Sequence, residues 1–263
     1  MRSISSGEEM RKIGVILLSG GLDSTTVAAY AKKQGYELIA ITLHYGQKHS
    51  KEVESAKKVA QLMGIRQEVI DISFFKKLAW YSALTSSEKF KIPKQRDDEE
   101  RARDIPITYV PLRNTLFITM VAAFLESAVL NLIEKENVDP ADVEASLFIA
   151  ANAIDYSGYP DCRPEYYEQI TKAIYEGSKL GTQYKKPINI QTPILLKTKS
   201  DIVKMAMDLK APLEHTWSCY EGGEVPCGTC DSCVLRAKGF AEAGCNDPLI
   251  ERLKKDGRIS KSK

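Results

Sequence analysis

The sequence lacks several features that would define a broad class of protein. No apolar run approaches the roughly 20 residues that a membrane-spanning helix needs. The polar N-terminus MRSISSGEEMRK lacks the apolar core of a signal peptide. Neither sign of charge dominates, because 37 basic and 35 acidic residues leave a net charge of +2, which gives no general footprint for nucleic acid. These absences predict a cytoplasmic protein that binds neither a membrane nor a nucleic acid.

Histidine is scarce, and the first 161 residues contain no cysteine. The three histidines, His44, His49 and His215, do not have the spacing of a metal site or a catalytic triad. Three of the six cysteines fall between Cys227 and Cys233. Such crowding indicates a metal site in a reducing compartment rather than a disulfide framework.

Short apolar segments alternate with helical patterns along most of the chain. Strands are predicted at 13–18, 37–45, 66–72, 145–153 and 188–193, and helices at 23–34, 50–64, 111–130, 163–180, 198–209 and from 231 onward. A short charged tail is expected after the last helix. Alternation at this spacing is typical of α/β folds with a parallel sheet and helices on both faces. We therefore predict an open, doubly wound, mostly parallel five-stranded sheet with a small C-terminal helical subdomain.

One stretch departs from this regularity. Residues 86–106 are charged and have almost no apolar periodicity, so they are predicted to form a loop. A solvated excursion is the favoured interpretation. A lid over the substrate is the alternative, because long loops over α/β sites often close on a ligand.

The first predicted strand ends in the turn Ser-Gly-Gly-Leu-Asp-Ser, residues 19–24, where a helix begins at once. Glycines permit unusual backbone angles and a close ligand approach, and a helix N-terminus favours an anion such as phosphate. The hydroxyls of Ser19, Ser24 and Thr25 can add donors. The turn is neither a Walker A motif nor a dinucleotide-binding G-x-G-x-x-G motif. It predicts a phosphate site, and a ligand-free tight turn is the alternative.

Four cysteines follow the spacing C-x7-C-x2-C-x2-C: Cys219, Cys227, Cys230 and Cys233. Four thiolates give zinc a closed tetrahedral site, which is typical of a structural metal. An iron–sulfur cluster and chance clustering of buried cysteines are the alternatives. Cys162 and Cys245 remain, and each is interpreted as an inert thiol.

Several motifs together resemble one enzyme family. The spelling S-G-G-L-D-S resembles the PP-loop of ATP pyrophosphatases, which cleave ATP between its α- and β-phosphates. With the stretches HYGQKHSKEVESAKKVA, YVPLRNTLF, SGYPDCRPEYY and TWSCYEGGEVPCGTCDSCVLRAKGF, it resembles the 7-cyano-7-deazaguanine synthase (QueC) family from about residue 13 to 243. The sequence departs from the family at Leu22, commonly Gln, at Leu112, more often Gly, and in a longer stretch at 125–144.

The resemblance implies an adenine nucleotide alpha hydrolase-like fold, with a PP-loop nucleotide-binding domain at 11–198 and a helical zinc-binding subdomain at 199–255. It implies conversion of 7-carboxy-7-deazaguanine and ammonia to the 7-cyano product, for queuosine or archaeosine biosynthesis. The carboxylate and then the amide would each be activated by AMP transfer from ATP. The implied cofactors are ATP, Mg²⁺ with the ATP, and structural Zn²⁺, and the implied assembly is a homodimer.

The resemblance also assigns candidate site residues. Those for catalysis are Asp23, Arg113 and Lys199. Those for ATP are Leu17, Leu18, Ser19, Gly20, Gly21, Leu22, Asp23, Ser24, Thr25, Thr26, Val27 and Tyr45. Those for the deazapurine are Asn114, Asp155, Tyr156, Ser157, Asp161 and Arg163. For Arg113 a structural salt bridge is an equal alternative.

Two other functions remain open. A PP-loop enzyme that thiolates or ligates tRNA is the nearer alternative, although thiolation normally needs reactive cysteines near the glycine turn. A zinc-module regulator that binds DNA is the other, and the acidic stretch EGGEVPCGTCDSC disfavours it.

Overall fold

The computed structural model describes residues 10–45, 51–86, 88–91, 105–154 and 159–260. Five strands form one sheet in the order β3-β2-β1-β4-β5, and all pairings are parallel. The strands are β1 (Arg11–Leu17), β2 (Glu37–His44), β3 (Arg66–Asp71), β4 (Val143–Phe148) and β5 (Ile188–Gln191). The predicted five-stranded α/β architecture is confirmed. The 3-2-1-4-5 order also confirms the doubly wound topology.

Helices connect the strands and cover both faces of the sheet. They are α1 (Leu22–Lys33), α2 (Lys51–Met63), α3 (Phe75–Leu78), α5 (Arg113–Glu134), α6 (Pro164–Gly177), α7 (Lys179–Thr182), α8 (Lys199–Asp208), α9 (Asp231–Ala243) and α10 (Pro248–Lys255), with single 3-10 turns at Pro140–Asp142, Pro160–Cys162 and Leu213–His215. The helix predicted at 163–180 is two helices, because Ser178 is extended and its hydroxyl caps α7 by accepting from Gly181 N–H at 3.0 Å.

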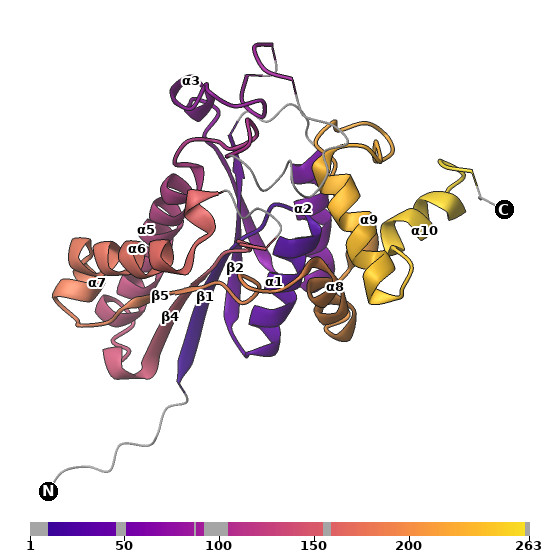
Figure 1. Cartoon of the computed structure of the whole chain (residues 1–263). Coiled ribbons are helices and arrows are strands. Elements are labelled where there is room, and N and C mark those ends of the chain that lie inside the picture. The colour runs from indigo at the N-terminus through magenta and orange to yellow at the C-terminus, as the bar shows by residue number, and fades with distance from the viewer. Residues whose placement is uncertain (1–9, 46–50, 87, 92–104, 155–158, 261–263) are drawn as a thin grey trace, which may run out of the picture.

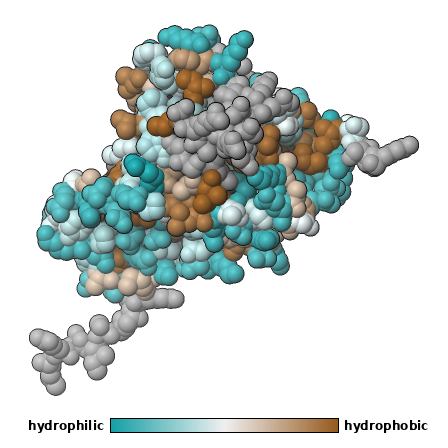
Figure 2. Space-filling view, viewed as in Figure 1, coloured by the Kyte–Doolittle hydropathy of each residue, from teal (hydrophilic) through white to brown (hydrophobic). Residues whose placement is uncertain are grey.

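Alternation along the strands divides the core into two layers. Ile13 and Val15 of β1 pack with α5, α6 and α7 on one face, whereas Ile16 and Leu18 pack with α1 and α2 on the other. Figure 1 shows these two groups of helices on opposite sides of the sheet. In Figure 2 hydrophilic residues gather over α6 and α7, as expected for outer faces of helices whose inner faces are buried.

Helix α5 has the length and composition of a membrane span, whereas the sequence analysis predicts no such run. Its residues Ile118, Val121 and Leu125 are buried in the core against the sheet. The buried face of α5 is therefore part of the hydrophobic core.

The C-terminal region packs beside α1 rather than on the sheet (Figure 1). Helix α10 was missed, since only a charged tail was expected there. Asp247 caps it, and Leu249 and Leu253 are buried against the cysteine segment. Buried Arg236 of α9 links that helix to the start of α10, because it donates to the Asp247 carboxylate at 2.6 and 2.9 Å.

The carboxyl ends of β1 and β4 lie side by side where the strand order reverses. Ligands of open α/β sheets bind at such a switch point. The turn at residues 19–24 follows β1 directly, so the predicted phosphate site lies there. Most of the predicted loop at 86–106 falls outside the described residues, and neither interpretation of it is tested.

Candidate active site and metal centre

The glycine turn is held against the first turn of α2. Gly20 has a φ of +80°, and a Cβ built on it would lie 2.4 Å from Ala56 N and 2.6 Å from Glu52 O. The Gly20 carbonyl accepts hydrogen bonds from the Ser55 hydroxyl at 2.8 Å and from Trp217 N–H at 2.9 Å. Only glycine can adopt this backbone angle and approach α2 so closely. The contacts with α2 and with Trp217 hold the turn in place.

Two hydroxyls organise the inside of the turn. Ser24 Oγ lies 2.9 Å from Ser19 Oγ and accepts from Ser19 N–H at 3.2 Å. Gly21 N–H points at Ser19 Oγ at the long distance of 3.4 Å. Gly21 also caps α1 without a side chain. The backbone N–H groups of Ser19 and Gly21 thus make long local bonds, which an anion can replace.

Asp23 and Lys199 form an ion pair across the turn. Lys199 Nζ lies 2.8 Å from both carboxylate oxygens of Asp23, and the lysine side chain is only 11% exposed. Lys199 opens α8, which begins with a side-chain cap: Thr198 Oγ1 accepts from Asp201 N–H at 3.2 Å. The pair brings a cation beside the helix start of α1, where a phosphate would carry opposite charge.

A cavity of about 300 Å³ opens at the carboxyl ends of β1, β2 and β4, within the size range of small-molecule pockets. Its walls bring together many residues predicted for ATP, catalysis and substrate: Leu17, Leu18, Ser19, Asp23, Ser24, Tyr45, Arg113 and Asn114. A second cavity of about 180 Å³ adjoins the turn and is lined by Gly21, Leu22, Asp23 and Lys199 among others. Thr25, Thr26 and Val27 are buried in α1 and line neither cavity.

Arg113 supplies positive charge to the larger cavity. Burial alone would lower its pKa, but Tyr45, Tyr159 and Asp161 outweigh burial and raise the pKa of the guanidinium. The side chain stays charged among cavity-lining tyrosines, and Nε donates to Asn114 Oδ1 at 3.3 Å. This environment suits binding of an anion such as a phosphate or a carboxylate.

The residues predicted for the deazapurine are placed differently from one another. Asn114 is buried and lines the larger cavity. Asp161 is buried beneath that wall, where burial raises its pKa and Arg113 and the Asn114 backbone N–H oppose the rise. Arg163 is exposed and donates to Pro160 O at 3.1 Å. Asp155, Tyr156 and Ser157 lie outside the described residues. Their roles stay predictions.

Glu52 was not singled out by the sequence, yet it lines both cavities. Burial raises the pKa of its carboxyl from the ordinary value of 4.5 to about 7, although Arg113 opposes the rise. Its neighbour Glu54 on α2 is exposed. Glu52 is therefore a carboxyl that can gain or lose a proton near neutral pH beside the glycine turn.

Substitution of Glu52 by glutamine should change how stability depends on pH. Between about pH 4.5 and 7 the folded chain keeps a proton that the unfolded chain releases, so the free energy of unfolding falls as the pH rises through that window. Glu52→Gln cannot ionise, so its melting temperature should exceed that of the wild type at pH 8 and converge on it at pH 5. Glu54→Gln is the control and should track the wild type, and parallel curves for Glu52→Gln would refute the burial argument.

The cysteine-bearing segment forms part of the site wall. Besides the Trp217 bond to Gly20, the Ser55 hydroxyl contacts the carbonyl of His215. Trp217, Cys219 and Tyr220 line the larger cavity. The indole Nε1 of Trp217 in turn donates to Cys219 O at 3.1 Å. A shift of the cysteine-bearing segment would therefore move the glycine turn, because the two are hydrogen-bonded to each other.

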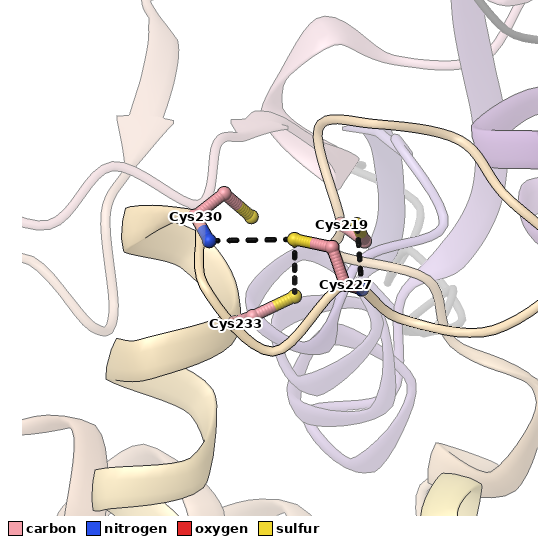
Figure 3. Close-up of side chains that lie close together, drawn as sticks. All are labelled: Cys219, Cys227, Cys230 and Cys233. Atoms are coloured by element: carbon pink, nitrogen blue, oxygen red, sulfur yellow. Dashed lines mark hydrogen bonds between the residues drawn. The ribbon is translucent and has the colours of Figure 1, made fainter. Parts of the chain in front are cut away.

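The four predicted metal ligands meet in one cluster (Figure 3). Their sulfurs all lie within 4.8 Å of one another, whereas four sulfurs on one zinc stand about 3.8 Å apart at Zn–S distances of about 2.3 Å. Cys227 Sγ accepts from the backbone N–H groups of Thr229 and Cys230 at 3.5 and 3.3 Å. Sulfurs that accept backbone hydrogen bonds are suited to the thiolate form that binds a metal.

The electrostatics of the cluster also fit a cation. Hydrogen bonds from the thiols of Cys230 and Cys233 lower the pKa of Cys219. A divalent ion would displace the remaining thiol protons and bind the sulfurs as thiolates. The donor set is four sulfurs from one loop and the start of α9. These residues fit a closed, structural zinc site.

Comparison with known proteins agrees with this geometry. The family model described as "Queuosine biosynthesis protein QueC" matches residues 13–244. The chain belongs to the QueC family. The match spans the glycine turn, both cavity walls and all four clustered cysteines, so the described site lies inside the family's shared region.

Individual members of the QueC family are similar over most of their length. The chain is 46% identical to the 7-cyano-7-deazaguanine synthase of Thermoplasma acidophilum, covering 91% of this chain and 92% of that protein. It is 44% identical to that of Trichodesmium erythraeum, covering 90% and 99%. A solved NMN synthetase from Francisella tularensis shares 14% identity at a TM-score of 0.38, covering 94% and 83%, which is too distant to bear on function.

Proposed function

We propose that this QueC-family chain is a 7-cyano-7-deazaguanine synthase. It converts 7-carboxy-7-deazaguanine and ammonia to the nitrile with two molecules of ATP. The observation that carries the proposal is the meeting of the glycine turn, the Asp23–Lys199 pair and Arg113 around adjoining cavities at the switch point of the sheet. The names of its relatives give the product, 7-cyano-7-deazaguanine.

The chemistry follows from the poor reactivity of a carboxylate. A carboxylate oxygen attacks the α-phosphorus of ATP, the bond to the β-phosphate oxygen breaks, and pyrophosphate leaves. Ammonia adds to the acyl carbon, AMP departs with the first carboxylate oxygen, and loss of a proton gives the amide. The amide oxygen then attacks the α-phosphorus of a second ATP, and a second pyrophosphate leaves. Loss of AMP and two N–H protons from the adenylated amide gives the nitrile. The protein must align the reactants and stabilise the departing phosphates.

The residues divide this work by position. The backbone of residues 19–24 and Lys199 bind the departing pyrophosphate, because they present N–H donors and a cation at one helix start. Arg113 neutralises the substrate carboxylate or the α-phosphate from the opposite wall. Tyr45 and Asn114 contact the adenosine and the deazapurine. Glu52, with a pKa near neutrality, accepts protons released by the attacking ammonia.

The metals have separate roles. A Mg²⁺ that accompanies ATP would be bound near Asp23, a carboxylate that lines both cavities. Zinc would be held by Cys219, Cys227, Cys230 and Cys233, where it supplies folding energy and no step of the reaction. A homodimer remains part of the proposal, as does a cytoplasmic location.

The alternative of tRNA thiolation is disfavoured by the state of Cys162, a cavity-lining thiol outside the cysteine cluster. Cys162 lines the larger cavity, but burial, and then the charge of Asp161, raise its pKa to about 12. A thiol with that pKa is protonated at neutral pH and is a poor nucleophile. No observation on the described residues favours a nucleic-acid substrate over the small molecule.

Product analysis tests the proposal. Purified protein incubated with ATP, ammonium and 7-carboxy-7-deazaguanine should form the nitrile, with AMP and pyrophosphate as the nucleotide products, by mass spectrometry and chromatography. Omitting ammonium should stop the reaction at adenylation. Formation of ADP and phosphate, or an absolute need for glutamine with a partner protein, would contradict the proposed function.

A further inference from the structure

A glycine in the middle of α9 lies against the candidate catalytic lysine. Gly239 is buried, and a Cβ built on it would lie 2.3 Å from Lys199 Cγ, 3.0 Å from Lys199 Cβ and 3.3 Å from the Lys199 carbonyl carbon. Cβ atoms essentially never approach a neighbour within 3.0 Å. Glycine disfavours a helix interior relative to alanine, so its presence here has a packing reason.

That reason is the path of the lysine stem. Lys199 starts at the N-terminus of α8, passes over α9 at Gly239 and ends with Nζ 2.8 Å from both oxygens of Asp23 on α1. The atoms that meet the built Cβ belong to the base of the side chain rather than to its mobile end. A methyl group at position 239 must therefore either move the lysine or separate α8 from α9.

Separation of the helices is resisted by the core beneath them. One hydrophobic cluster joins Leu22 of α1, Val203 and Ala206 of α8, and Phe240 of α9, all of them buried. Phe240 is the neighbour of Gly239, so a displaced α9 would open a cavity in this cluster. The lysine stem is the part that yields, and its ammonium then leaves Asp23.

We propose that Gly239 is a positioning residue, whose bare backbone on α9 leaves the groove through which Lys199 reaches Asp23 and the phosphate site. The inference rests on the proposed function, in which Lys199 contacts the leaving pyrophosphate. It gives the region that carries the zinc ligands a second task, because the same helix that begins at the thiolate cluster also sets the position of a catalytic cation.

Gly239→Ala tests this directly. It should lower kcat/KM for ATP at least about 10-fold, since small displacements of a reacting group are costly in rate. Two controls match it. Gly177→Ala lies at the end of α6 with no atom within 4 Å of the built Cβ, and should behave as the wild type. Gly181→Ala would clash with Tyr175 O at 2.0 Å, far from the cavities, and should lower the melting temperature but keep kcat/KM of the folded enzyme.

A double-mutant cycle separates positioning from general damage. Lys199→Ala removes the Cγ that meets the new methyl, so adding Gly239→Ala to it should bring no further loss of activity and a smaller fall in melting temperature than in the wild type. Full activity of Gly239→Ala, or an equal fall in melting temperature with and without the lysine stem, would overturn the proposal. The thermal cycle needs no turnover. If the wild type forms no nitrile, the proposed function is overturned. The thermal cycle still shows whether position 239 and the Lys199 stem are in contact.

Discussion

Replacing Gly20 with alanine should abolish nitrile formation, with kcat/KM at least about 100-fold lower. The new Cβ would lie 2.4 Å from Ala56 N and 2.6 Å from Glu52 O. Both are backbone atoms of α2, which cannot rotate away as a flexible side chain can. The turn must then leave α2, and its hydrogen bonds to Ser55 and Trp217 are lost with it. Steady-state kinetics with ATP as the varied substrate measures the effect.

Gly35→Ala separates the clash from the strain of the backbone. Gly35 follows the C-cap of α1 with a φ of +82°, almost the same as that of Gly20, but its built Cβ meets no atom within 4 Å. Both substitutions carry the left-handed penalty of roughly 1–2 kcal/mol. Only Gly20→Ala should lose activity. Equal kinetics for the two variants would show that the close approach to α2 does not matter to the reaction.

Cys230→Ala should remove zinc, stability and activity together. Cys230 is buried at the N-cap of α9 and lies between Cys227 and Cys233 in the sequence of the cluster. Because the unfolded chain has no formed site, the metal's binding energy contributes to folding. Losing only about 3 kcal/mol would lower the melting temperature by roughly 6–12 °C for a chain of this size. Activity should fall as well, because Trp217 in the same segment holds the Gly20 carbonyl.

Cys245→Ala is the matched control, since Cys245 lies outside the cluster. Its zinc content by elemental analysis and its melting curve should equal those of the wild type. A Cys230→Ala variant with a full zinc complement would show that the four-thiolate assignment is wrong. A variant that loses zinc and activity but melts normally would make the metal catalytic rather than structural.

The parallel sheet and the glycine turn at its first strand were predictable because their signals are local. The apolar run from Ile13 to Leu18 predicts a strand, and the glycines that follow predict its abrupt end. The thiolate cluster was predictable for the same reason, since three ligands lie within one short segment. Helix α10 could also have been found, because Asp247 and Pro248 form an N-terminal signal ahead of Leu249 and Leu253.

The rest of the site depends on contacts between distant parts of the chain. Lys199 and Asp23 are 176 positions apart, and Ser55 and His215 are 160 apart. In the sequence, Glu52 and Glu54 are both acidic residues in the first turn of α2, and nothing distinguishes them. Only the packed structure shows that Glu52 lines the cavities. The closeness of Gly239 to Lys199 is likewise invisible until α8 and α9 are packed together.

Oxygen tracing tests the central claim that AMP transfer activates the carboxylate and then the amide. The protein would be given 7-carboxy-7-deazaguanine labelled with ¹⁸O in both carboxylate oxygens, together with ammonium and ATP, and the products analysed by mass spectrometry. The account predicts two AMP for each nitrile, one ¹⁸O in each AMP, and none in pyrophosphate. Label in pyrophosphate, phosphate or water, or a nitrile formed without labelled AMP, would contradict it.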